Sequence, residues 1–177
     1  MIWALQVVTG EELRLAQLIR ERIERVDCIL PTRELFEKRG EIWRKVTRTM
    51  LPGYLFLKIP ESQTDGSACE IAKLWHQVRH TAGVLRILGT MQREDRARLK
   101  ALENGGLPWG ISTGTRRGGI LDGPLAGHED WIVELDWHRR RAKIRLNIGE
   151  DVHDITVGIC EDGDQGCARF AGAEENA

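Results

Sequence analysis

Two periodicities of apolar and polar positions alternate along the first hundred residues. The run from Trp3 to Val8 is apolar and partly β-branched, which predicts a short buried strand. Thr9 and Glu12 have the spacing of a capping box, so a helix is expected to start there. The apolar positions that follow fit one helical face: Leu15, Leu18, Ile19, Ile23 and Val26.

The next segments predict a hairpin, two further strands and two helices. Strands over 29–36 and 42–59 bracket a turn at 38–41, where Gly40 supplies a positive φ. Pro52-Gly53 interrupts the second arm, so 54–57 is expected as a separate strand. The apolar spacing then predicts a helix around Ile71 to Val78, a strand over 84–88 and a helix over 90–104. This mixed order lacks a regular βαβ period and predicts an α+β fold with an antiparallel sheet.

Beyond residue 104 the pattern changes. Residues 105–119 hold six glycines and one proline, so we predict a flexible linker over 105–117 that separates a first domain, 1–104, from a second. Short period-2 runs separated by turn residues follow, and they predict a small β-barrel over 118–159. The acidic segment 160–177 is expected to be a disordered tail.

Composition narrows the function classes. The chain has 177 residues and a net charge of −1, and its 41% apolar and 30% charged content predicts a globular protein. No apolar run is long enough for a bilayer span, and no secretory signal precedes Trp3, which predicts a cytoplasmic protein without membrane contact. The four cysteines are scattered without a CxxC pair, so free thiols are expected. We find none of the common nucleophile, phosphate-loop or zinc-protease motifs, so no catalytic residue, metal or cofactor is expected.

Charge divides along the chain. Residues 1–104 contain 18 Lys and Arg against 14 Asp and Glu, whereas residues 160–177 contain 1 against 5. The predicted hairpin is basic, and so is the run that begins at His138. Within that run Arg141, Lys143 and Arg145 share one face of a strand, while Arg139 and Arg140 lie in a turn. Such a row could track a phosphate backbone or serve only as the solvated face of a barrel; charge alone favours neither.

One apolar step also has two interpretations. Residues 50–56, from Met50 to Phe56, contain Pro52-Gly53 inside an otherwise apolar run. Aromatic strand residues usually pack inside, which favours a core role. The Pro-Gly turn could alternatively present an aromatic side chain in an apolar docking pocket.

Several of these pieces, taken in order, resemble the NusG family of transcription elongation factors. They are Trp3, the Thr9-Gly10-x-Glu12 helix start, Pro31-Thr32 with its charged hairpin, Pro52-Gly53-Tyr54-Leu55-Phe56, Val78-Arg79-His80-Thr81, the glycine-rich linker, and the segment 122–127. The resemblance covers residues 1–159. It implies an NGN domain, a four-stranded antiparallel sheet flanked by helices, followed by a small SH3-like KOW barrel.

The resemblance also implies partners and sites, without catalysis. Family members bind the clamp helices of the largest RNA polymerase subunit through an apolar patch. By position this patch falls on Val7, Leu51, Pro52, Tyr54 and Phe56. Contacts to the gate loop and the non-template DNA strand fall at His80 and Thr81. A monomer that bridges the polymerase cleft and suppresses pausing is expected.

Departures from the housekeeping pattern favour a specialised member. Ala4 and Leu51 stand where many members carry an aromatic residue. The Phe-rich KOW features associated with Rho and a small-subunit ribosomal protein are absent. The basic run and the hairpin look most like LoaP-type paralogues, which are associated with processive antitermination and leader-RNA recognition. An RNA-binding row is therefore expected, for a nascent RNA hairpin, at Arg139, Arg140, Arg141, Lys143 and Arg145.

Two alternatives stay open at this point. A housekeeping NusG would couple polymerase to Rho or to the ribosome. Whether the second domain binds Rho or structured RNA would distinguish it from a specialised antiterminator. A ribosome-associated KOW protein would bind RNA without touching polymerase. The apolar step at Leu51 and Tyr54 argues against the latter.

Overall fold

The computed structural model describes residues 1–23, 26–60, 68–148 and 151–164. The chain forms two compact units, which are each described by themselves. The first unit consists of residues 1–31 and 51–106, and the second of residues 32–50 and 107–177. Because the second unit takes its first nineteen residues from within the first, the division is not the simple sequential one that the glycine-rich segment suggested.

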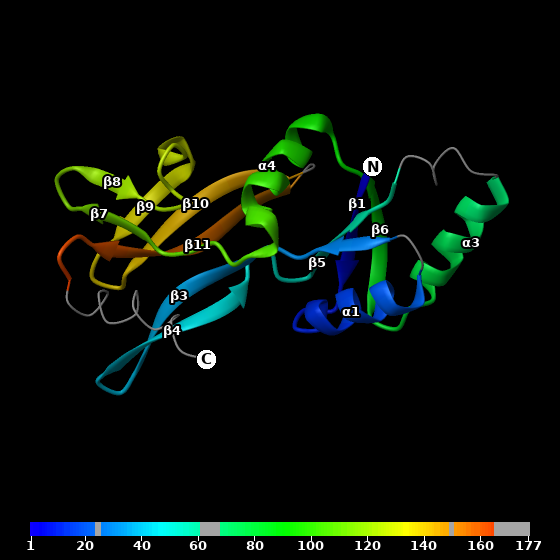
Figure 1. Ribbon diagram of the computed structural model, residues 1–177, viewed down its shortest axis with the longest axis horizontal. Helices are drawn as coiled ribbons and strands as arrows, with labels where there is room; N and C mark the ends of the chain where they lie inside the picture. The colour runs from blue at the N-terminus through cyan, green and yellow to red at the C-terminus, as the bar shows by residue number, and fades with distance from the viewer. Residues whose placement is uncertain (24–25, 61–67, 149–150, 165–177) are drawn as a thin grey trace. The chain divides into compact units, whose positions relative to one another are not determined.

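The first unit is built on a four-stranded antiparallel sheet in the order β2-β5-β1-β6 (Figure 1). Its strands are β1 (Ile2–Val7), β2 (Asp27–Ile29), β5 (Tyr54–Lys58) and β6 (Val84–Thr90). Its helices are α1 (Glu12–Arg22), α3 (Ala68–Arg79) and α4 (Arg93–Glu103), with the short η1 (Asn104–Gly106) after α4. The antiparallel α+β prediction is therefore confirmed.

Alternation along the strands places one hydrophobic cluster of this unit on a single face of the sheet. Leu5, Leu55 and Leu57 point to the same side and pack with Leu15 and Ile19 of α1. Helix α3 adds Val78, and the rings of Trp75 and Trp3 lie 4.3 Å apart. The apolar positions expected from the helical and strand periods of the sequence thus pack together on this face of the sheet.

Two helix starts differ from the expected positions. The N-cap of α1 is Glu11, and no side chain caps it. Instead of completing a capping box with Thr9, the Glu12 carboxylate accepts hydrogen bonds from the backbone N–H of Gly10 (2.9 Å) and Gly53 (2.7 Å). Helix α4 begins at Arg93 because Thr90 is still paired to Trp3 within β6.

The second unit contains a five-stranded sheet in the order β8-β7-β11-β10-β9 and the hairpin β3–β4. The strands of the sheet are β7 (Ser112–Thr115), β8 (Gly119–Asp122), β9 (Ile132–Asp136), β10 (Arg141–Ile148) and β11 (Asp151–Glu161), with the short η2 (Glu129–Trp131) before β9. The hairpin strands are β3 (Thr32–Arg39) and β4 (Ile42–Thr49), and Gly40 at the turn has a φ of 60°. The expected hairpin and the strands after residue 118 are confirmed.

The linker predicted over 105–117 is wrong in its second half. Residues 112–115 form β7, which pairs in parallel with the end of β11 and antiparallel with β8. Ser112 is buried, and its hydroxyl accepts a hydrogen bond from the Leu125 N–H (2.9 Å). The small residues and glycine of β7 give no apolar alternation in the sequence, because backbone pairing with neighbouring strands, and not side-chain hydropathy, holds this strand in place.

The hairpin β3–β4 packs on the five-stranded sheet of its own unit. Backbone hydrogen bonds link Glu34 N–H to the Trp109 carbonyl (2.8 Å) and Trp109 N–H to the Thr32 carbonyl (2.7 Å). A Cβ built on Gly158 of β11 would lie 2.7 Å from the Glu34 carbonyl oxygen, so the two backbones are in direct contact there. Glycine at 158 is what permits this approach.

The expected tail and thiols also need correction. Residues 160 and 161 complete β11, and Cys160 is buried and disulfide-bonded. Cys28 is a free thiol, as expected. Residues 165–177, which the tail prediction mainly concerns, lie outside the described residues, and so do residues 149–150 of the predicted barrel.

Candidate functional site

Residues 51–56 of the apolar step form a corner of the first unit. Val7, Leu51 and Phe56 are at most 3% exposed, so these three side chains belong to the core and do not reach a partner in this conformation. Pro52 is exposed and Tyr54 is half-buried. Of the five residues expected to bind the clamp helices, these two alone are presented at the surface.

Backbone hydrogen bonds and one buried carboxylate hold this corner. Val7 N–H donates to the Gly53 carbonyl (2.8 Å), and Tyr54 N–H donates to the Leu51 carbonyl (3.2 Å). The Glu12 side chain, 3% exposed, receives the Gly53 N–H from the other side. Gly53 has a φ of 82°, a conformation that costs a non-glycine residue roughly 1 kcal/mol or more. The turn is therefore fixed on both sides, with Pro52 exposed and Tyr54 half-buried.

His80 and Thr81 follow the end of α3. Thr81 is 8% exposed, and its hydroxyl donates to the Gln77 carbonyl (2.9 Å). His80 is exposed, and its ring lies 4.3 Å from that of His76. Of the two residues, His80 is accessible to a partner, whereas the Thr81 hydroxyl is engaged within the fold.

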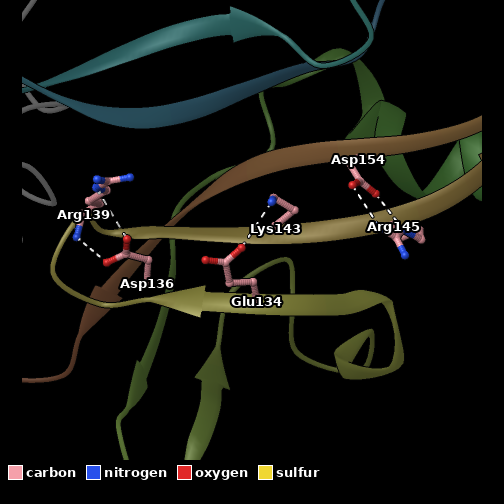
Figure 2. A network of polar contacts seen from close by, with 6 residues as sticks. All are labelled: Glu134, Asp136, Arg139, Lys143, Arg145 and Asp154. Carbon is pink, nitrogen blue, oxygen red and sulfur yellow. Dashed lines mark hydrogen bonds and ion pairs between the residues drawn. The ribbon is translucent and has the colours of Figure 1, made fainter.

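Two cations of β10, Lys143 and Arg145, form ion pairs with neighbouring strands, and Arg139 forms one within the turn before β10 (Figure 2). Arg145 donates to both carboxylate oxygens of Asp154 on β11, at 2.7 and 3.0 Å. Lys143 Nζ lies 3.2 Å from Glu134 of β9, and Arg139 Nε lies 3.7 Å from Asp136. The hydrogen bond from Arg145 holds the pKa of Asp154 below its usual value. Three of the five expected RNA contacts are therefore already compensated by carboxylates.

Of the other two residues of the expected row, Arg141 is half-buried in β10 and Arg140 contacts the hairpin. Arg140 lies over the rings of Phe36 and Trp43, with its guanidinium carbon 5.3 and 4.9 Å from the ring centroids, and it pairs with Asp164 at 2.6 Å. Its side chain is 13% exposed. Burial, with a smaller contribution from the positive charge of Arg141, lowers the pKa of Arg33 to about 10. Arg140 thus supports the fold and is shielded from a nucleic acid.

The hairpin carries exposed cations that lie outside the expected RNA-binding row. Its cross-strand register places Arg39 opposite Ile42 and Glu37 opposite Arg44, so all four residues share one face. Arg39, Ile42 and Arg44 are exposed. The only sequence signal was the density of Lys and Arg in this segment.

The described residues contain no group of three or more His, Cys, Asp and Glu side chains arranged to hold a metal. Burial raises the pKa of the Cys28 thiol to about 12, so this buried cysteine is unsuited to act as a nucleophile.

Comparison with known proteins decides the family. A family model described as "Transcription termination factor nusG" matches residues 2–101. The chain belongs to the NusG family. The family resemblance predicted from the ordered motifs is confirmed; the assignment to the LoaP type stays a prediction.

Curated NusG relatives match most of the chain. The transcription termination/antitermination protein NusG of Buchnera aphidicola subsp. Acyrthosiphon pisum (strain APS) is 25% identical over 164 residues, covering 82% of this chain and 86% of that protein. The Yersinia pestis protein of the same name is 27% identical with the same coverage. A crystal structure of an MjSpt4:Spt5 complex overlaps with a TM-score of 0.33 and 17% identity, covering 89% of this chain and 93% of the other. Of the described helices, none combines the length and hydropathy that a bilayer crossing needs.

Proposed function

We propose that this NusG-family protein is a cytoplasmic transcription elongation and antitermination factor that binds RNA polymerase and acts without catalysis. The observation that carries the proposal is the family match over residues 2–101, which includes the whole Pro52–Tyr54 corner. We further propose that the five-stranded sheet of the second unit is the KOW barrel of the family.

The proposed polymerase contact is an apolar knob of two residues on a rigid base. Pro52 and Tyr54 meet the clamp helices, while Val7, Leu51 and Phe56 are buried within the first unit and make no contact with the partner. The Glu12 carboxylate contributes by holding the Gly53 N–H. A small, preorganised aromatic contact loses little conformational entropy on binding, which suits a hot spot.

The test compares two exposed positions of the first unit in binding to purified RNA polymerase. Tyr54→Asp places a carboxylate in the apolar contact and should weaken binding by roughly tenfold or more. Leu13→Asp, at a 68% exposed apolar residue of α1, should leave the affinity unchanged. Circular dichroism checks that both variants are folded. If Leu13→Asp weakened binding while Tyr54→Asp did not, the docking surface would lie elsewhere.

We propose that His80 makes the contact to the gate loop or the non-template DNA strand. Its exposed imidazole is available, whereas the Thr81 hydroxyl is bonded to Gln77. His80→Ala should reduce pause suppression in an in vitro transcription assay while polymerase affinity stays near that of the wild type. An unchanged pause pattern would remove His80 from the site.

The finer proposal is a specialised antitermination role with contact to a nascent RNA hairpin. The exposed cations of the hairpin β3–β4 support RNA contact, whereas Lys143 and Arg145 of β10 would first have to leave their carboxylate partners. In transcription through an intrinsic terminator, the protein should raise readthrough, and a leader RNA hairpin should increase the effect. Stimulation of Rho-dependent termination instead would favour the housekeeping alternative. Failure to retain polymerase in a pull-down would favour the ribosome-associated one.

A further inference from the structure

We propose that the exposed tip of the hairpin β3–β4, with Arg39, Ile42 and Arg44, binds single-stranded RNA such as the unpaired loop of an RNA hairpin. The inference rests on the proposed function in one respect, that the factor works on a nascent transcript. It names a surface distinct from the β10 row.

Charge is the first argument. Residues 32–50 contain six Lys and Arg against three Glu, a net charge of +3. The three carboxylates are engaged: Glu37 with Arg48 at 3.0 Å, Glu34 with Lys45 at 3.0 Å, and Glu41 with Lys38 at 3.8 Å. Among the described residues, no carboxylate lies within 4.0 Å of Arg39 or Arg44. These two guanidinium groups are therefore available to phosphates without first breaking an ion pair.

Geometry selects the accessible face. Phe36 and Trp43 lie on the opposite face from Arg39 and Arg44 by strand alternation, and the buried Arg140 covers their rings. The turn of the hairpin projects away from the five-stranded sheet of its unit (Figure 1). The contacts with the sheet thus fix the base of the hairpin and leave the tip face with Arg39, Ile42 and Arg44 open.

The chemistry of the three side chains favours unpaired RNA. Arginine presents a planar fork that can bind phosphate with two hydrogen bonds or stack on a base. Ile42 lies directly opposite Arg39 and is 60% exposed, so an apolar contact sits beside the cations. Unstacked bases of a loop offer both a phosphate chain and apolar faces, whereas a duplex conceals its base faces.

A salt titration tests the surface with the full chain and a fluorescent RNA hairpin carrying an unpaired loop. Arg39→Ala/Arg44→Ala should weaken binding about tenfold. It should also reduce the slope of log affinity against log salt by about 1.4, the contribution of two phosphate contacts to a single strand. The matched control, Arg93→Ala/Lys100→Ala, removes the same charge from exposed positions of α4 and should change neither quantity. Equal effects of the two double variants would overturn the proposal.

Two further arms locate and classify the ligand. Ile42→Ala should lower the affinity for the unpaired loop severalfold without changing the salt slope. Fully paired RNA of equal length should bind the wild type more weakly than the loop does, and Ile42→Ala should not change its affinity. Lys143→Ala/Arg145→Ala should flatten the slope less than the hairpin variant. A larger effect from the β10 pair, or a duplex bound as tightly and as sensitively as the loop, would overturn the assignment.

Polymerase binding separates this proposal from the one on which it rests. Arg39→Ala/Arg44→Ala should bind polymerase with wild-type affinity, because the docking corner at Pro52 and Tyr54 belongs to the other unit. If Arg39→Ala/Arg44→Ala bound RNA as tightly as the wild type while its polymerase binding stayed intact, only the hairpin surface would be contradicted. Loss of polymerase binding in Tyr54→Asp with RNA affinity retained supports both.

Discussion

Strand β10 and the hairpin β3–β4 are both rich in Lys and Arg, yet they present their charge differently. On β10, the flanking strands supply Glu134 and Asp154 directly opposite Lys143 and Arg145. The hairpin contains only three glutamates for its six cations. Arg39 and Arg44 have no carboxylate within 4.0 Å among the described residues. A basic stretch in a sequence is therefore not yet an anion-binding surface, because cross-strand partners decide how much of its charge is free.

The comparison depends on the hairpin being held on the sheet of its unit, and Gly158 tests this most directly. Gly158→Ala adds a Cβ 2.7 Å from the Glu34 carbonyl oxygen and 2.9 Å from the Ile111 side chain, so backbone must shift. We expect the free energy of unfolding to fall by about 3 kcal/mol, at the upper end for overpacking. Urea denaturation followed by tryptophan fluorescence measures the change.

Gly110→Ala is the control for that substitution. Its Cβ would meet its nearest neighbours at 4.0 Å, an ordinary contact distance, so stability should stay near that of the wild type. If Gly158→Ala were as stable as Gly110→Ala, the hairpin would not be packed on β11.

Two adjacent arginines, Arg139 and Arg140, test whether a cation of the basic run supports the fold or is only exposed charge. Arg140→Ala removes a buried guanidinium that contacts Phe36 and Trp43 and pairs with Asp164, and it should lower the free energy of unfolding by about 2 kcal/mol. Arg139→Ala, at a side chain that is 78% exposed, should leave stability almost unchanged. The same urea titration applies, and similar losses for both variants would contradict a structural role specific to Arg140.

The smallest expected effect concerns the ion pair between Arg145 and Asp154. Because Arg145 lowers the pKa of Asp154 in the folded protein, the pair stabilises the fold above the unfolded pKa of aspartate, about 4. This contribution is lost as the pH falls through the lower folded pKa. The stability difference between wild type and Asp154→Asn should therefore be small at pH 6 and vanish under strongly acidic conditions. High salt should reduce it as well.

Asp130→Asn supplies the reference for this pH series, since Asp130 is exposed and has no ion pair within the described part of the chain. Its difference from the wild type should not follow the same pH dependence. Matching profiles for the two variants would mean that the Arg145–Asp154 pair contributes nothing in solution, and β10 would then be as free to bind anions as the hairpin.

Local sequence determined most elements of this protein. The helical spacing of Leu15 and Ile19, the alternation around Leu55 and Leu57, and the turn at Gly40 each require a particular backbone, and all are observed. The ordered motifs also determined the family. Of the expected docking residues, the sequence located the Pro52–Tyr54 corner and favoured a core role for the apolar step, and the structure shows that Val7, Leu51 and Phe56 are the buried members. Hydropathy identifies apolar positions without telling a core face from an exposed one.

Only the tertiary structure decided which charges are free and where the units divide. Strand β7 has too few apolar residues to be predicted from its own sequence. It forms because β11 and β8 supply backbone hydrogen-bond partners. The hairpin joins the second unit through Trp109 and Arg140, residues about seventy and one hundred positions from the hairpin. Pairing between distant segments fixes which carboxylate neutralises which cation. For this reason the β10 row looked available in the sequence, whereas Arg39 and Arg44 were distinguished only by the fold.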